Sequence, residues 1–121
     1  MSDLICRDLC MTFRDAQSGA EVEALKNINF ELNQGEILAV LGPSGCGKTT
    51  LLNMIAGFLN PTSGDLTLGG VEINGPGAER GMVFQQGALF EWLTVARNVD
   101  FGLRMSGAPE EETAEKVLNW L

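Results

Sequence analysis

The residues of this chain best suited to chemistry form one short stretch, GPSGCGKTT, from Gly42 to Thr50. Its spacing fits the phosphate-binding pattern G-x-x-x-x-G-K-[ST] without a mismatch. Glycines at 42, 45 and 47 permit backbone angles closed to other residues, so that successive N–H groups can point inward and hold an anion. The stretch therefore predicts a polyphosphate site. A glycine-rich turn that merely caps a helix is the alternative, and the strand and helix expected on either side argue against it.

The side chains of this loop have separate expected roles. Lys48 supplies a full positive charge for the outer phosphates, and the helix that begins near it adds the positive end of its dipole. The Thr49 hydroxyl is the expected ligand of Mg²⁺, and Thr50 is expected at an inner phosphate. The residues expected to hold the nucleotide are Gly42, Pro43, Ser44, Gly45, Cys46, Gly47, Lys48, Thr49 and Thr50.

The elements that must position this loop follow from the apolar pattern around it. Ile37 to Leu41 is short, wholly apolar and followed by glycine, which predicts a buried parallel strand. The helix from Lys48 is expected to have Leu51, Leu52, Met54 and Ile55 on its apolar side and Gly57 as its C-cap. Alternating residues predict half-buried strands at 4–13 and 25–32 with a polar hairpin loop between them.

Downstream, a second hairpin is expected over 65–73 around Gly69 and Gly70, and a short buried strand over Gly81 to Gln85. The pattern becomes helical from Leu93, and a further helix is expected with Pro109 and the glutamates after it in its first turn. Its apolar residues are Val117, Leu118 and Leu121, and those of the preceding helix are Val95, Val99 and Leu103.

Composition narrows the function classes. The chain has 121 residues, 45% of them hydrophobic, enough for one modest core. Its net charge of −8 argues against nucleic acid as a partner, since no basic stripe is visible. No apolar run approaches the ~20 residues of a membrane span, and the N-terminus lacks signal-peptide features, so a cytoplasmic location is expected. Cys6 and Cys10 are expected to be buried strand residues, whereas Cys46 lies beside Lys48 in the loop.

Three stretches together resemble the ATP-binding subunit of ABC transporters, in particular the branch that serves taurine, nitrate and sulfonate importers. They are EALKNINFELNQGEILAVLGPSGCGKTTLLNMIAGF, SGDLTLGG and INGPGAERGMVFQQGALFEWLTVARNVDFGL. The resemblance implies an α/β P-loop NTPase core of ABC ATPase type with an N-terminal antiparallel β subdomain, truncated in its helical subdomain. Residues 1–92 correspond to the β subdomain and P-loop core, and residues 93–121 to the start of the helical subdomain.

The resemblance also implies site residues and partners. Phe13 matches the aromatic residue that stacks on adenine, and Gln85 matches the glutamine that joins the Mg²⁺ shell, with Lys48 and Gln85 as the catalytic residues. Without the family, a core aromatic is the alternative for Phe13, and a polar residue that ends a strand is the favoured interpretation of Gln85. The implied ligands are ATP and Mg²⁺, and the implied location is peripheral, on the inner face of the cell membrane.

The implied partners are a second ATP-binding subunit and a transmembrane permease subunit, contacted through Ala88 to Asn98. Phe90 and Trp92 are expected interface anchors, although they could be core residues. Glu91 departs from the proline usual at this position, which predicts a loop that is less rigid or suited to another partner.

Other motifs of the resembled family are not in these 121 residues: a serine-glycine-glycine signature, a strand ending in Asp-Glu, and a switch histidine. The chain is therefore expected to bind ATP without hydrolysing it alone. Within an importer, the expected role is to couple MgATP binding and hydrolysis to uptake of a small anion such as taurine, sulfonate or nitrate. A P-loop small-molecule kinase and a non-catalytic nucleotide-binding fragment are the alternatives.

Overall fold

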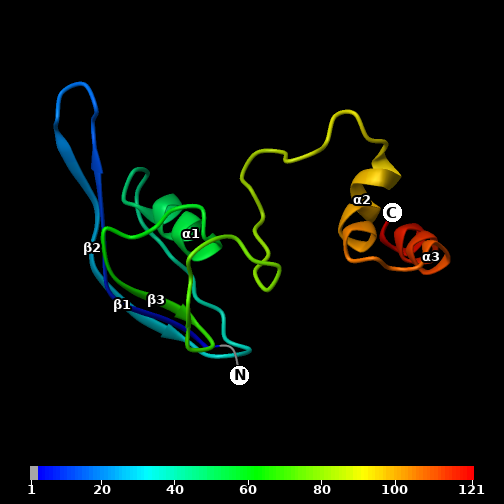
Figure 1. Cartoon of the computed structure of the whole chain (residues 1–121), viewed down its shortest axis with the longest axis horizontal. Helices are drawn as coiled ribbons and strands as arrows, with labels where there is room; N and C mark the ends of the chain where they lie inside the picture. Colours follow the sequence, from blue (N-terminus) through cyan, green and yellow to red (C-terminus); the bar gives the residue numbers. More distant parts are fainter. Residues whose placement is uncertain (1–2) are drawn as a thin grey trace. The chain divides into compact units, whose positions relative to one another are not determined.

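A computed structural model describes residues 3–121 of the chain. The chain divides into two compact units, one ending at Met82 and the other running from Val83 to Leu121. The first unit is built on one antiparallel sheet in the order β2-β1-β3-β4, of which Figure 1 labels β1, β2 and β3. Its strands are β1 (Leu4–Arg14), β2 (Glu21–Leu32), β3 (Ser63–Leu68) and β4 (Val71–Glu72).

The two antiparallel hairpins predicted from the sequence are confirmed. β3 and β4 turn at Gly69 and Gly70, both of which have positive φ angles. β2 begins at Glu21, earlier than predicted, because the connection from β1 is a tight turn around Asp15. The Asp15 carboxylate accepts backbone N–H bonds from Gln17 and Ser18, and these bonds lower the pKa of that carboxyl.

Helix α1 (Lys48–Ala56) packs against the sheet and completes the core of the first unit. Leu51 and Met54 are buried with residues of the sheet and the segment after it: Leu4, Cys6, Leu9, Leu25, Leu66 and Ile73. Leu52, predicted on the apolar side, is 50% exposed, so that prediction was wrong for this residue. Gly57 caps the helix in the left-handed conformation as predicted, and its N–H donates to the Met54 carbonyl.

The predicted buried strands at Ile37 to Leu41 and Gly81 to Gln85 are wrong for this structure. Neither segment joins a strand ladder; Ile37 is 96% exposed and Val83 is 97% exposed. A parallel strand needs a neighbouring strand for its hydrogen bonds and cover on both faces. The described residues form the sheet β2-β1-β3-β4, in which neither segment has a neighbouring strand.

The second unit contains α2 (Val95–Met105) and α3 (Glu110–Trp120). The helix predicted from Leu93 begins at Val95, since the Thr94 side chain caps it by accepting from the Arg97 N–H. Val117 of α3 is buried, but Leu118 and Leu121, predicted to lie with it, are 76% and 68% exposed. Packing on α2 alone buries only a narrow stripe of α3. Of the helices described, none has the length and apolar character to cross a membrane.

Candidate functional site

The loop from Gly42 to Gly47 has no regular secondary structure and leads directly into α1. Gly45 and Gly47 have φ angles of 80° and 99°, which confirms that these two glycines use the left-handed region. Gly42 was expected to do the same, yet its φ is not positive. A Cβ at Gly42 would instead lie 2.7 Å from the Cys46 Sγ, so glycine there permits close packing inside the loop.

Strand β2 supports the end of this loop. A Cβ added to Gly47 would lie 2.7 Å from both the Ala24 carbonyl oxygen and the Leu25 side chain, so the loop rests directly on that strand. β1 pairs with β2, and Phe13 is opposite Val22 in that ladder. Phe13, 39% exposed, therefore lies on the strand adjacent to the one that supports the loop.

The start of α1 offers positive charge and free donors. The Lys48 ammonium donates to the carbonyl oxygens of Gly42 and Pro43, with a distance of 3.0 Å to Pro43. In the described chain, no side chain caps the helix at Gly47 and no acidic residue occupies its first turn. The N–H groups of this turn and the positive end of the dipole therefore remain available to an external anion. This geometry fits a polyphosphate.

The remaining loop side chains are accessible. Thr49 and Ser44 are exposed and Thr50 is half-buried. Cys46 is exposed, whereas Cys6 is fully buried, and burial raises the pKa of the Cys6 thiol to about 11. Cys10 was predicted to be buried but is only half-buried, because the β1–β2 ladder is irregular around it. Its Sγ accepts the Asn27 N–H there.

Gln85 lies in the second unit, outside any strand and exposed. The structure therefore does not bring Gln85 and the phosphate loop together within one compact unit. The proposed role of Gln85 at a metal ion remains a prediction.

The segment Ala88 to Asn98 is held by one side chain. The Asn98 carboxamide accepts from the Phe90 N–H at 2.8 Å and donates to the carbonyl oxygens of Phe90, Leu93 and Thr94. The Phe90 ring also contacts the rings of Trp92 and Phe101 in tilted geometries, with ring centroids 5.3 and 4.5 Å away. Trp92 is 80% exposed. These bonds tie Phe90, Leu93 and Thr94 to the first turn of α2. The effect of Glu91, a loop that is less rigid or suited to another partner, remains a prediction.

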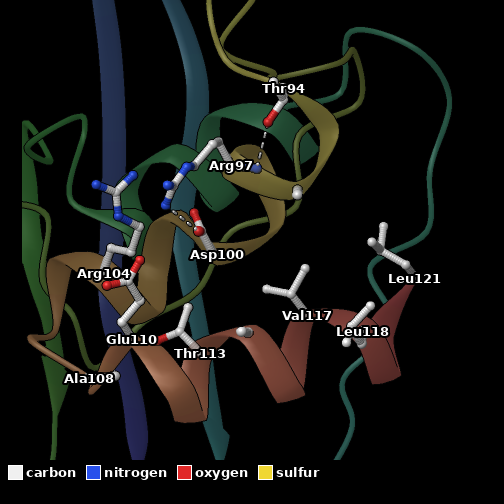
Figure 2. Close-up of a pocket in the computed structure, with 12 residues that line it drawn as sticks. Thr94, Arg97, Asp100, Arg104, Ala108, Glu110, Thr113, Val117, Leu118 and Leu121 are labelled. Carbon is white, nitrogen blue, oxygen red and sulfur yellow. Dashed lines mark hydrogen bonds and ion pairs between the residues drawn. The ribbon is translucent and has the colours of Figure 1, made fainter.

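A cavity of about 650 Å³ lies between α2 and α3 within the second unit (Figure 2). Arg97 and Asp100 form an ion pair at 3.1 Å at its polar end, and Val117 and Leu118 contribute apolar surface. Asp100 is buried, and its Oδ1 has no hydrogen-bond partner among the residues described. No residue of the phosphate loop lines this cavity, so it is separate from the candidate nucleotide site.

The contacts of Arg80 in the first unit were not predicted from the sequence. The guanidinium of Arg80 donates to the backbone of α1 and to the loop before Arg80 itself. An arginine before an apolar segment gives no sign of such partners, since Ile55 is 25 residues away in the sequence.

Comparisons with known proteins identify the family of the chain. The family model described as "ABC transporter" matches residues 25–121. The taurine import ATP-binding protein TauB of Pelagibacter ubique is 66% identical over the whole chain, and that of Jannaschia sp. is 58% identical over 97% of it. The matches cover 45% and 43% of those proteins, so the chain spans less than half the length of these relatives.

A solved structure gives the same result for the fold. The ATP-binding cassette MJ0796, in a dimeric post-hydrolysis state bound to ADP and Pi, superposes with a TM-score of 0.81 at 28% identity. The match covers 96% of this chain and 54% of that one. The fold class predicted from the sequence, an ABC-type P-loop ATPase domain present in part, is confirmed.

Proposed function

The chain belongs to the ABC transporter family, and on that premise we propose that it is the nucleotide-binding part of an importer ATPase that holds MgATP at Gly42 to Thr50. The observation that carries the proposal is the uncapped start of α1 beside the Lys48 ammonium. Fixed donors and charge at that position are what a triphosphate requires. The family match argues against the alternative of an unrelated small-molecule kinase.

In this proposal each residue has a defined task. The Lys48 ammonium exchanges the carbonyl oxygens of Gly42 and Pro43 for outer phosphate oxygens. Thr49 presents its hydroxyl to Mg²⁺, which neutralises phosphate charge when bound, and Gln85 supplies a carboxamide oxygen. Phe13 offers a partly exposed ring for the adenine base.

The transported substrate that we propose is taurine or a related small sulfonate, with nitrate as a further member of the same importer branch. Support comes from the names of the relatives quoted above, which are taurine import ATP-binding proteins. The proposed partners are a second ATP-binding subunit and a transmembrane permease subunit. The segment from Ala88 to Asn98, with Trp92 exposed, would contact the permease at the inner face of the membrane.

Cysteine labelling tests the proposed nucleotide site. At neutral pH a maleimide should modify exposed Cys46 much faster than buried Cys6, whose raised pKa leaves little thiolate. MgATP should slow modification of Cys46, because the phosphates would cover the loop, and should leave Cys10 unaffected. Peptide mass spectrometry over a time course gives the three rates. Cys46 labelling that MgATP does not change would contradict the proposal.

Binding without turnover is the second expectation for residues 1–121. These residues hold Lys48 and Thr49 but not the serine-glycine-glycine signature, the strand ending in Asp-Glu or the switch histidine of the family. Because phosphoryl transfer depends on positioning water and stabilising charge, most of the rate enhancement should be missing. Phosphate release should not exceed that of a Lys48→Ala control over hours. Multiple turnovers that Lys48→Ala abolishes would show that a residue in this chain replaces the missing groups.

A further inference from the structure

Arg80 binds the end of α1 opposite to the phosphate loop. Its guanidinium donates to the Ile55 carbonyl in the last turn of the helix at 2.7 Å and to the Gly75 carbonyl at 2.6 Å. Glu79 accepts two further bonds from the same guanidinium, at 3.0 and 3.2 Å. The Arg80 side chain is only 13% exposed, so its bonds to the two carbonyl groups are partly shielded from water, whereas the Glu79 side chain is 58% exposed.

The surrounding backbone is shaped for this contact. A Cβ on Gly57 would lie 2.1 Å from the Gly75 carbonyl oxygen, so the helix end and the loop are in direct contact. A Cβ on Gly77 would lie 2.3 Å from the Glu79 carboxylate, which occupies that space and holds Arg80. The negative end of the helix dipole also favours a cation at the C-terminal end of a helix.

Three contacts then fix the direction of α1. Gly47 rests on β2 at its start, Leu51 and Met54 pack into the core along its length, and Arg80 holds Ile55 at its end. Thr49 and Ile55 are six residues apart, or about 9 Å along the helix axis. A change of tilt at Ile55 therefore displaces the Thr49 hydroxyl at the other end.

We propose that Arg80 is a positioning residue that acts through α1, setting the place of the Thr49 hydroxyl and so the contribution of Mg²⁺ to nucleotide binding. The inference rests on the proposed function. Mg²⁺ requires near-ideal octahedral geometry at short distances, so a displaced hydroxyl weakens the metal contact more than it weakens the many N–H contacts to phosphate.

The test compares ATP affinity with Mg²⁺ and with EDTA in the wild-type chain, Arg80→Gln and Arg80→Lys. The ratio of the two Kd values isolates positioning, because a variant that is only partly folded loses affinity by the same factor in both conditions. Arg80→Lys keeps the charge but lacks the planar fork that reaches two carbonyl groups. Arg7→Gln, an exposed arginine on β1, is the matched control.

In Arg80→Gln we expect the ratio of the Kd with EDTA to the Kd with Mg²⁺ to fall about tenfold. This is the lower end of the loss in metal affinity that follows replacement of a residue supporting a metal ligand. The same ratio should also fall in Arg80→Lys, which keeps the test valid if Arg80→Gln does not fold. Arg7→Gln should keep the wild-type ratio. Combining Arg80→Gln with Thr49→Ala should lower the ratio no further than Thr49→Ala alone, since both act on one contact.

The outcomes distinguish a failure of the inference on Arg80 from a failure of the proposed function. This inference is overturned if the ratio is unchanged in folded Arg80→Lys. The proposed function stays intact in that case if the wild-type chain binds nucleotide and Lys48→Ala abolishes the binding. Strict additivity with Thr49→Ala overturns the inference as well. Absence of nucleotide binding by the wild-type chain would overturn the proposed function, and the role of Arg80 with it.

Discussion

A Lys48→Ala chain is expected to melt at the same temperature with and without MgATP, whereas the wild-type chain is stabilised by it. The physical reason is mass action: a ligand that binds only the folded state adds about 2.7 kcal/mol at roughly a hundredfold excess over its Kd. Alanine removes the ammonium that the structure places against the loop carbonyl groups. Thermal melts followed by circular dichroism, with and without nucleotide, measure the difference.

Lys116→Ala is the matched control, because Lys116 pairs with Glu112 on α3 in the other unit. This exposed pair is worth only a few tenths of a kcal/mol, so the control should respond to MgATP as the wild type does. Equal responses of wild type and Lys48→Ala would contradict the assignment of Lys48.

Gly47→Ala is expected to destabilise the first unit by about 2–4 kcal/mol and to abolish nucleotide binding, through the combined cost of an unfavourable φ and a core-facing collision. The φ angle is 99°, and the new Cβ would lie 2.7 Å from the Ala24 carbonyl oxygen. The backbone of β2 cannot move aside without disturbing its ladder. The loop must shift instead, taking its N–H groups away from the phosphates.

Gly35→Ala provides the comparison, since Gly35 has a similar φ of 86° and nothing within 4 Å of an added Cβ. It should lose only the conformational term, about 1–2 kcal/mol, and retain nucleotide binding. Urea denaturation of the two variants measures the free energies of unfolding. A loss for Gly47→Ala no larger than that for Gly35→Ala would show that the loop does not rest on β2.

Local patterns in the sequence predicted the elements whose causes are local. The α1 boundaries follow from Lys48 and from Gly57, which adopts the left-handed cap conformation that the sequence suggests. The two hairpins follow from alternation and from Gly69 and Gly70. The phosphate loop follows from residue spacing alone, because its geometry is built from consecutive backbone groups.

Features that depend on distant partners could not be predicted in this way. The apolar run at Ile37 to Leu41 suits a buried strand, but pairing requires neighbours that the run itself does not specify. Cys10 fits the alternation of β1, yet a ladder irregularity leaves it half-buried. The bond from Arg80 to Ile55 joins residues 25 positions apart, and no periodicity connects them.

Equilibrium dialysis of radiolabelled ATP against the purified chain, with Mg²⁺ and with EDTA, tests the central claim that Gly42 to Thr50 holds MgATP. We expect saturable binding with one site per chain, tighter with Mg²⁺ than with EDTA, and lost in Lys48→Ala. Binding that is absent in the folded wild-type chain, or that Lys48→Ala retains in full, would contradict that claim.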